Sequence, residues 1–369
     1  MPQFLSDIIE KFFGKNGGSV LGVDIGSSSI KVVQLRRQKG RAILETYGEL
    51  ALGPYAGSNV GQSTNLPVEK VVEALRDILA EKEVNLTTRN CGVAIPFASS
   101  LMSVIEMPAV PFKELSQMVP IEARKYVPVA ISEVSLDWSV IPQDRDERDD
   151  KNAPAKTEVL LVAIHNNTIE KYSEIVTKSG LSSTFFEIEI FSTMRSILDQ
   201  EVVPVMILDM GATSTKLYII ERGILRSSHT INRGGQSVTM SLSKSLGISM
   251  QEAEVMKREK GLPGEASGIG LKDVIVVTLD FIFSEANQVV LAYQKKYNKN
   301  ISKVFLVGGG SALKGLEEVA KKSFQTEVVC GNPFGKVVAP AFLEDVLKTT
   351  GPEFAVAVGV ALRKMQESE

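Results

Sequence analysis

Two stretches of the chain repeat one pattern of residues that is suited to binding phosphate. Residues 24–31 read DIGSSSIK and residues 209–216 read DMGATSTK, with Asp, Gly, Ser and Lys in the same register. In both, an apolar strand ends in an acidic residue, a glycine permits a tight turn, and small hydroxyl residues lead into a second strand. Such a turn presents backbone N–H groups to a phosphate. We therefore predict two hairpins that clamp a nucleoside triphosphate from opposite walls of a cleft.

The acidic residue of each hairpin predicts a metal ion. Asp24 and Asp209 end the first strand of each hairpin and are expected beside the phosphates. A carboxylate is tolerated there when a divalent cation lies between the two negative groups, and Mg²⁺ that keeps most of its waters is the usual ion. A magnesium-bound nucleotide is therefore the expected ligand.

A third glycine-rich stretch supports a nucleotide site. Residues 303–316, KVFLVGGGSALKGL, predict a buried strand that runs into three glycines and the start of a helix, where the backbone can approach a nucleotide closely. Other nucleotide motifs are absent. The nearest match to a Walker A loop, residues 331–337, is one residue short and has no Ser or Thr after Lys336. No G-x-G-x-x-G follows the first strand, so a dinucleotide-binding motif is also excluded.

Composition describes an ordinary soluble protein. With 369 residues, the chain exceeds what one hydrophobic core usually serves, so two or more domains are expected. The net charge of −3 gives no electrostatic signature of nucleic-acid binding. Cys91 and Cys330 lack metal-ligand spacing and predict reduced thiols. No apolar run reaches the roughly 18 residues of a membrane span, and no cleavable signal pattern is present. We predict a cytoplasmic location.

The N-terminal residues predict an amphipathic helix. Residues 3–13, QFLSDIIEKFF, place their apolar side chains on one helical face. We favour packing on the body or on another copy over an interfacial membrane helix, which needs more basic residues than Lys11 and Lys15. Residues 14–18 predict a flexible joint before the first strand.

An insert is predicted between the two hairpins. A strand at 41–50, a Gly/Pro/Ser/Asn-rich loop at 52–65 and an amphipathic helix at 67–83 come first. Residues 86–156 then predict a small ββαβ-like unit. Its strands are expected at 91–97, 101–107 and 134–141, around a helix at 112–126 that Pro120 should kink or divide. The charged run 143–156 predicts a solvated loop.

The chain then returns to the main body with an almost fully apolar strand. Residues 157–165 have the composition of a strand buried on both faces. Glu187 and Glu189 alternate with apolar residues further on. Ser249 and Glu252 form a predicted capping box that opens a helix. Helices are also expected at 168–179, 238–246, 272–296 and, as an Ala/Val-rich closing helix, at 352–365.

In this order, the hairpins, the glycine-rich turn and the small-residue closing helix resemble the actin, sugar kinase and heat-shock chaperone ATPase superfamily. From Val20 onward the chain is more closely similar to the PilM family, the actin-like cytoplasmic proteins of type IV pilus assembly, themselves similar to the division protein FtsA. The stretches that carry the likeness are GVDIGSSSIKVVQL, KELSQMVPIEARKYVP with SEVSLDW, TEVLLVAIHNN, RGGQSVTMSLSKSLGISMQEAEVMKRE and GPEFAVAVGVAL.

The resemblance implies an α/β, actin-like (ribonuclease H-like, duplicated) two-domain fold with an inserted subdomain of the FtsA and PilM type. The implied parts are an N-terminal helix and linker (1–18), subdomain IA (19–85, 157–205 and 340–369), the inserted subdomain IC (86–156), subdomain IIA (206–235 and 300–339) and subdomain IIB (236–299).

The resemblance also assigns roles within the site. Asp24 and Asp209 would face the metal. Lys31 would contact phosphate, and Glu254 with Lys257 would line the ribose and adenine. Backbone or small side chains would surround the rest of the nucleotide at Gly26, Ser27, Ser28, Ser29, Gly211, Ala212, Thr213, Gly234, Gly235, Gly308, Gly309, Gly310 and Ser311. Glu187 falls where PilM relatives carry an Asp, near the water-positioning segment, and is the candidate catalytic residue. Because this chain has Glu in place of that Asp, we expect at most weak ATPase activity.

The resemblance implies a role in protein assembly. The protein would bind ATP or ADP and dock the short N-terminal cytoplasmic tail of a PilN-like inner-membrane protein. The resemblance leaves open whether the protein forms a homo-oligomer. It would lie in the cytoplasm, peripheral to the inner membrane through its partners, and connect indirectly to the pilus motor and PilO-side components of twitching motility. The alternatives are an FtsA-like division protein, which carries a C-terminal amphipathic helix that this sequence does not show, and a superfamily ATPase or sugar kinase, which needs a general base.

Overall fold

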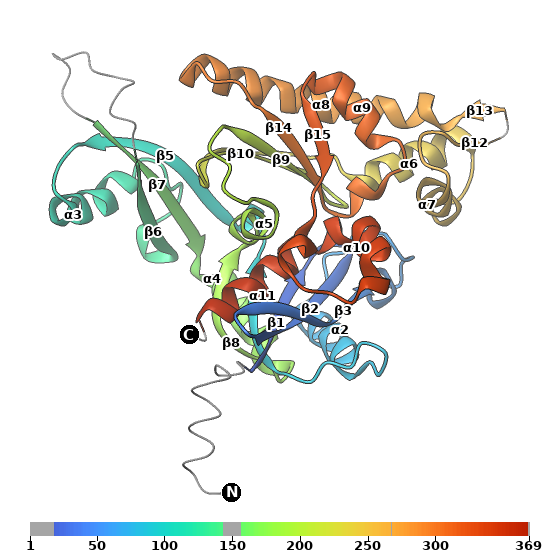
Figure 1. Ribbon diagram of the computed structural model, residues 1–369, viewed down its shortest axis with the longest axis horizontal. Coiled ribbons are helices and arrows are strands. Elements are labelled where there is room, and N and C mark those ends of the chain that lie inside the picture. Colours follow the sequence, from blue (N-terminus) through green and yellow to red (C-terminus); the bar gives the residue numbers. More distant parts are fainter. Residues whose placement is uncertain (1–17, 143–155, 267, 368–369) are drawn as a thin grey trace, which may run out of the picture.

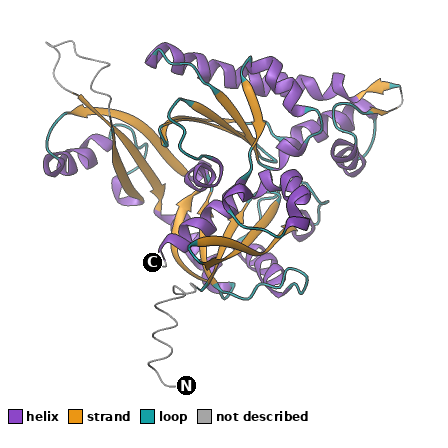
Figure 2. Cartoon of the chain, viewed as in Figure 1, coloured by secondary structure: helices purple, strands orange, loops and turns teal. Residues whose placement is uncertain are grey.

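The computed structural model describes residues 18–142, 156–266 and 268–367, and it consists of two α/β domains and a smaller lobe (Figure 1). The N-terminal segment 3–13 and the charged run up to residue 155, both discussed above, lie outside the described residues. Helices cover the sheets of both domains (Figure 2).

The first domain is built on a five-stranded sheet in the order β3-β2-β1-β4-β8. β1 pairs with β2 and β2 with β3 in antiparallel fashion, whereas β4 runs parallel to both β1 and β8. Apolar residues of α2 and α4 pack on one face, and α11 packs on the other. The strands are β1 (Ser19–Ile25), β2 (Ser29–Gln38), β3 (Arg41–Ala51), β4 (Asn90–Ile95) and β8 (Ser182–Ile188), and the helices are α2 (Val68–Ala80), α4 (Asn166–Lys178) and α11 (Ala355–Glu367).

The second domain repeats this arrangement. Its sheet has the order β11-β10-β9-β14-β15. β9 pairs with β10 and β10 with β11 in antiparallel fashion, whereas β14 runs parallel to both β9 and β15. The repeated sequence pattern is therefore a repeated structure, with β1 and β2 matching β9 and β10. The strands are β9 (Val205–Met210), β10 (Thr215–Glu221), β11 (Ile224–Ile231), β14 (Lys303–Val307) and β15 (Glu327–Cys330).

Four helices complete the second domain and bury one face of its sheet. They are α6 (Gly235–Leu246), α7 (Met250–Glu259), α8 (Leu271–Tyr297) and α9 (Leu316–Phe324), with a small hairpin of β12 (Glu265–Ala266) and β13 (Ile269–Gly270). The predicted capping box is confirmed at the start of α7, where Ser249 and Glu252 bond to each other's backbone. Among the described helices, α8 alone has the length and composition to cross a membrane, but Leu279, Ile282 and Phe283 lie in the domain core.

In its described residues, the lobe consists of a three-stranded sheet, in the order β5-β7-β6, and one helix. Its elements are β5 (Ser100–Pro108), α3 (Phe112–Ala123), β6 (Val134–Ile141) and β7 (Lys156–His165). Two predicted placements are wrong. β4 belongs to the first sheet and not to the insert, and β7 is the central strand of the insert and does not return to the main body.

β7 is apolar because both of its faces are covered. Val159 and Leu161 pack under α3, and Leu160 packs toward the second domain and α5 (Glu189–Ile197). The apolar composition of β7 therefore correctly predicted that both faces are buried, but the strand was assigned to the wrong sheet. Of the two outcomes predicted at Pro120, a kink or a division of the helix, the division is wrong, since α3 runs through Pro120 and buries Val119 before it and Ala123 after it.

Candidate functional site

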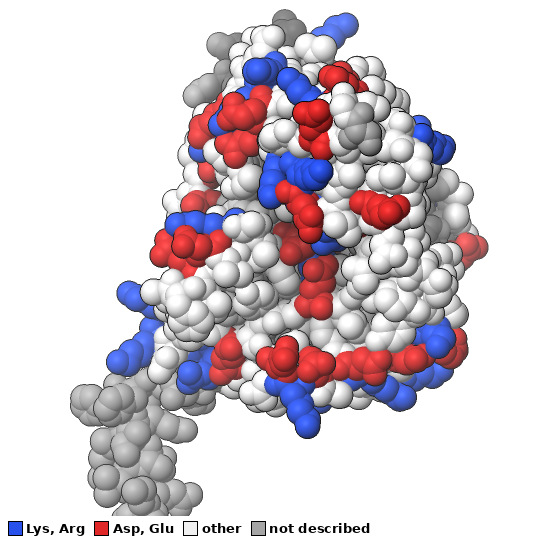
Figure 3. Space-filling model, turned by 90° about the vertical axis from the view of Figure 1, so that its right-hand side faces the viewer, with Lys and Arg blue, Asp and Glu red and all other residues white. Residues whose placement is uncertain are grey.

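A cavity of about 400 Å³ lies between the two domains, and both repeated turns line it. The first domain contributes the end of β1 with its turn, the start of α5 and the approach to α11. The second contributes the end of β9 with its turn, α6, α7 and the glycines after β14. On the face drawn in Figure 3 the surface is hollowed near its centre, and acidic side chains gather there.

Most of the predicted site residues line this cavity. They are Asp24, Gly26, Ser27, Ser28, Ser29, Lys31, Asp209, Gly211, Ala212, Thr213, Gly235, Glu254, Lys257, Gly308, Gly309 and Gly310. Gly234 and Ser311 lie behind the wall. A Cβ on Gly234 would stand 2.5 Å from the Gly211 carbonyl oxygen, so a glycine is needed there for close approach. The Ser311 hydroxyl, 2.7 Å from the Gly308 carbonyl oxygen, holds the glycine turn from outside.

The two turns have the same hydrogen bond. The Gly26 N–H donates to the Ser29 carbonyl at 3.0 Å, and the Gly211 N–H donates to the Ser214 carbonyl at 3.0 Å. The start of α6 then bonds to the second turn, because the Gly235 N–H donates to the Gly211 carbonyl at 2.9 Å. The repeat therefore extends to the geometry that presents backbone groups to a ligand.

Three carboxylates line the cavity within electrostatic reach of one another: Asp24, Asp209 and Glu189. Burial raises the pKa of Asp24 to about 7, although Lys31 and Lys216 oppose the shift. Burial also raises the pKa of Asp209, against the pull of Lys216. Buried carboxylates with raised pKa values indicate a position where negative charge lacks sufficient compensation, as at a metal or ligand site.

Two lysines lie beside these carboxylates. The Lys216 Nζ donates to Glu189 at 2.7 Å and lies 3.7 Å from an Asp209 oxygen. The Lys31 Nζ donates to the Ser29 hydroxyl at 2.7 Å and forms an ion pair with Glu49 at 3.0 Å. Burial works against the charge of Lys31, but Glu49 and its acidic neighbours raise its pKa, so the ammonium stays charged and available to phosphate.

The donor set fits Mg²⁺ that arrives with phosphates. Among the described residues, no three His, Cys, Asp or Glu side chains converge into a metal site. Mg²⁺ is usually held by one or two carboxylates together with substrate phosphates and water. Asp24 and Asp209, on facing walls of the cavity, match this requirement. The metal supplies charge neutralisation to the phosphates when it is bound.

Two of the three glycines in the turn after β14, Gly308 and Gly310, have no room for a side chain. Gly308 has a φ of +80°, and a Cβ there would stand 2.4 Å from an Asp209 carboxylate oxygen. A Cβ on Gly310 would stand 2.8 Å from the Met210 carbonyl oxygen. The Gly308 N–H donates to the Pro352 carbonyl at 3.0 Å, which ties this turn to the first domain.

The far end of the cavity is formed by α7. Lys257 and Glu254 form an ion pair at 2.7 Å, and the Thr239 hydroxyl donates to Glu254 at 2.6 Å. Burial disfavours the charge of Glu254, yet Lys257 and these hydrogen bonds hold its pKa below the usual value. Burial lowers the pKa of Lys257 despite the partner carboxylate. The pair predicted as lining a ribose and adenine therefore lies in the wall of the cavity and not on an open surface.

Glu187 does not line the cavity, and its placement as a catalytic residue is wrong. Its side chain is 5% exposed and is bound by Arg195 and Arg363 on the far side of α5. Glu189, two residues later, faces the cavity instead. The sequence indicated the correct segment, but the turn from β8 into α5 decides which of the two carboxylates points inward.

Sequence reasoning also missed further cavity residues: Glu49, Glu189, Thr193, Lys216, Arg258 and Glu353. A signal existed for Lys216, because it occupies the same register as Lys31 in the repeat. Glu49 could have been inferred from its cross-strand position opposite Lys31. Nothing local in the sequence distinguishes Glu353 or Arg258.

Comparison with known proteins agrees with this geometry. One chain of the solved PilM-PilN type IV pilus biogenesis complex matches with a TM-score of 0.77 at 22% identity, covering 94% of this chain and 98% of that one. MreB5 of Spiroplasma citri, solved bound to AMPPNP, matches with a TM-score of 0.51 at 13% identity, covering 95% and 97%. The duplicated sheets, the facing turns and the inserted lobe define an actin-like α/β protein of two domains.

The sequence comparisons identify the family. The chain is 23% identical to the cell division protein FtsA of Neisseria meningitidis serogroup B (strain ATCC BAA-335 / MC58) over 347 residues, 84% of this chain and 82% of that protein. FtsA of Bacillus subtilis (strain 168) is 22% identical over 358 residues, 86% and 79%. The family model described as type IV pilus assembly protein PilM matches residues 22–365. The chain belongs to this family of pilus assembly proteins.

Proposed function

We propose that the chain binds Mg·ATP or Mg·ADP in the cavity between its domains and uses the nucleotide to set its conformation. The observation that carries the proposal is the pair of matched turns, each with its Gly-to-Ser hydrogen bond and its Asp, on opposite walls. A ligand shifts a conformational equilibrium only if it contacts the two states differently. A nucleotide held from both domains meets that condition.

The charge of the cavity supports a metal-bound nucleotide over the nucleotide alone. Its wall carries six carboxylates (Asp24, Glu49, Glu189, Asp209, Glu254 and Glu353) and five cations (Lys31, Lys216, Lys257, Arg258 and Lys314). A wall that is already slightly acidic would repel a free triphosphate. A divalent cation between the phosphates and the two Asp residues removes that repulsion.

Isosteric substitution of the two Asp residues tests nucleotide binding. Asp24→Asn and Asp209→Asn keep the shape of the turns but remove the charge that would face the metal. We expect each to weaken Mg·ATP binding at least about tenfold, measured by calorimetry, since one lost charge contact costs about 1.5–3 kcal/mol. Asp280→Asn, on the exposed side of α8, is the control. Wild-type protein that binds no adenine nucleotide in the presence of Mg²⁺ contradicts the proposal.

Hydrolysis, where it occurs, would use Glu189. Its carboxylate lines the cavity, accepts the Phe97 N–H at 2.6 Å and the Lys216 ammonium at 2.7 Å, and lies beside both Asp residues. A carboxylate in this place can orient a water molecule toward a terminal phosphate. Both of its oxygens already accept a hydrogen bond, from Phe97 and from Lys216, so we expect the activity to be slow.

We further propose that the protein docks the N-terminal cytoplasmic tail of a PilN-like inner-membrane protein, and so lies in the cytoplasm at the inner membrane through its partner. Membership of the PilM family and the fold of the PilM chain in the PilM-PilN complex support this assignment. Connection to the pilus motor and to PilO-like components would follow through that partner.

A labelled peptide with the sequence of the partner tail tests docking. We expect saturable binding by fluorescence anisotropy, with an affinity that differs between apo, Mg·ADP and Mg·ATP protein because the nucleotide shifts the conformation. A scrambled peptide of the same composition is the control. Equal, weak signals from both peptides in all three states contradict the docking assignment, while leaving nucleotide binding unaffected.

A further inference from the structure

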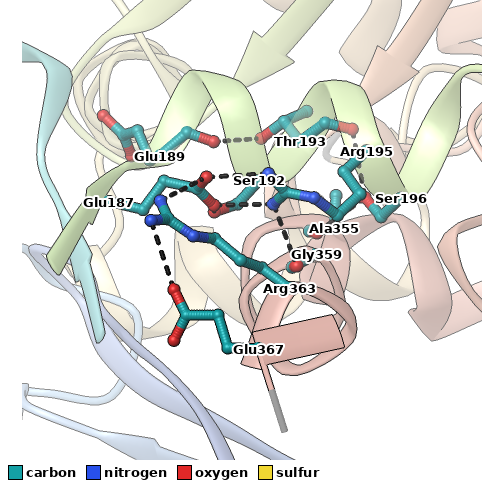
Figure 4. Close-up of polar contacts among 10 residues, drawn as sticks. All are labelled: Glu187, Glu189, Ser192, Thr193, Arg195, Ser196, Ala355, Gly359, Arg363 and Glu367. Carbon is teal, nitrogen blue, oxygen red and sulfur yellow. Dashed lines mark hydrogen bonds and ion pairs between the residues drawn. The ribbon is translucent and has the colours of Figure 1, made fainter. Parts of the chain in front are cut away.

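The carboxylate of Glu187 is enclosed by a cluster that sequence reasoning did not anticipate. Arg195 binds it bidentately, with its Nη1 2.7 Å and its Nη2 2.8 Å from the two oxygens. Arg363 donates at 2.9 Å, and the Ser192 hydroxyl donates at 2.5 Å. These four residues form the Glu187 cluster, which Figure 4 shows on the side of α5 away from Glu189.

The cluster connects three elements of the first domain. Glu187 lies near the end of β8, Ser192 and Arg195 lie on α5, and Arg363 lies near the end of α11. Arg195 also donates to the Gly359 carbonyl of α11 at 3.2 Å. The cluster therefore fixes α5 and α11 to each other and to the sheet.

The two helices touch along their length, with no room for adjustment. A Cβ on Gly359 would stand 1.9 Å from the Ser192 carbonyl oxygen, which shows how closely the backbones approach. The Ser196 hydroxyl donates to the Ala355 carbonyl at 2.7 Å. A shift at the Glu187 cluster must therefore move one helix against the other.

Both helices also carry cavity residues, which lie on the side of α5 away from the cluster and at the end of α11 away from Arg363. Glu189 and Thr193 of α5 line the cavity, as do Ala355 and Val356 at the start of α11. Glu353 precedes α11 and also lines it. The relative position of α5 and α11 thus sets where Glu189 stands with respect to a bound nucleotide.

We propose that Glu187 is a positioning residue, which holds α5 against α11 so that Glu189 and Thr193 are placed for the terminal phosphate of the nucleotide. This inference rests on the proposed nucleotide binding. Without the Glu187 charge, the guanidinium groups of Arg195 and Arg363 lose the carboxylate that they share, although Arg363 keeps its longer ion pair with Glu367 at 3.4 Å. Their repulsion separates the helices, because like charges at short distance in a buried site repel strongly.

The test compares ligands with and without the terminal phosphate. For Glu187→Gln we expect the Kd of Mg·AMPPNP to rise about tenfold while the Kd of Mg·ADP changes less than threefold, since only the terminal phosphate is beside Glu189. Arg363→Met, which removes one arm of the cluster and leaves the buried carboxylate bound by Arg195, should shift the same ratio in the same direction by a smaller factor. Glu187→Asp retains the charge, so its ratio of the Mg·AMPPNP Kd to the Mg·ADP Kd should stay close to that of the wild type.

Glu158→Gln is the matched control. Glu158 is 4% exposed and is bound by Arg226 at 2.8 Å, but it lies on β7 and is not a member of the Glu187 cluster. Equal changes in both Kd values for Glu187→Gln, or a Glu158→Gln ratio that shifts as much, overturn the positioning role. If wild-type protein binds neither nucleotide, the proposed function fails on its own. The positioning role is then decided by hydrogen–deuterium exchange of residues 189–197, which should rise in Glu187→Gln above its level in Glu158→Gln.

Discussion

Glu187 and Glu189 show how two identical side chains, two positions apart, reach opposite environments. Glu187 lies near the end of β8 and points to the side where two guanidinium groups enclose it. Glu189 begins α5 and points into the cavity toward Lys216. The change from strand to helix between them turns the chain, so the period-two alternation of a strand no longer applies. A sequence pattern can identify such a segment, but it does not show which of the two carboxylates faces the cavity.

The Glu187 cluster predicts a specific dependence of stability on pH. Burial opposes the charge of Glu187, but Arg195, Ser192 and Arg363 hold its pKa below the usual 4.5. A group whose folded-state pKa is depressed stabilises the fold above its unfolded pKa, and that contribution is lost as the pH falls through the folded value. The stabilisation by Glu187 is therefore complete at neutral pH and declines below about pH 4.5.

The measurement is the difference in Tm between wild type and Glu187→Gln across pH. At pH 7 we expect the variant to be less stable by about 3–5 kcal/mol, the usual cost of breaking a buried ion pair from one side. The Tm difference should shrink as the pH is lowered below 4.5. A difference that stays constant from pH 7 to pH 3.5 indicates that lost packing, and not lost charge, explains the variant.

At the scale of elements, α11 depends on glycines where it crosses β1. A Cβ on Gly22 would stand 2.0 Å from the Ala357 carbonyl oxygen and 2.7 Å from the Ala361 backbone nitrogen. These are backbone atoms, which cannot turn aside as a flexible side chain can. Gly22→Ala should therefore cost at least about 2–3 kcal/mol through overpacking and displacement of α11.

Gly18→Ala is the control for this substitution, because a Cβ at Gly18 meets no atom within 4 Å. We expect thermal and urea unfolding of that variant to match wild type within about 0.5 kcal/mol. If Gly22→Ala is as stable as the wild type, β1 and α11 can move apart at no energetic cost. That result would contradict the close packing of these two elements.

Elements defined by local chemistry could be predicted, whereas those defined by distant partners could not. The two hairpins, the glycine turn after β14 and the cap of α7 depend on residues within a few positions of one another. The sheets to which β4 and β7 belong are decided by the strands with which they pair. The sequence of an apolar strand does not indicate its pairing partner. Arg258 and Glu353 likewise reach the cavity only through the packing of whole subdomains.

For the whole molecule, contacts across the mouth of the cavity hold the two domains together. The loop at 57–65 of the first domain reaches the second, where the Ser63 hydroxyl donates to the Gln236 side chain and the Ser63 N–H lies 3.4 Å from the same oxygen. Gly61 packs against Glu254, since a Cβ there would stand 2.8 Å from its carboxylate. We therefore expect a nucleotide that is bound as proposed to enter and leave when these contacts open.

Opening of this loop should control the rate of nucleotide release. Ser63→Ala and Gln236→Ala each remove the hydrogen bond across the mouth, worth about 0.5–1.5 kcal/mol. We expect each to speed the release of a fluorescent ADP analogue several-fold in stopped-flow measurements, with Ser58→Ala as the control, because the Ser58 hydroxyl donates to Gly53 within the same loop. The double variant Ser63→Ala with Gln236→Ala should release no faster than the more affected single variant, because both changes break one contact. Additive effects would show that Gln236, which also lines the cavity, acts on the nucleotide directly and that the loop does not limit its exchange.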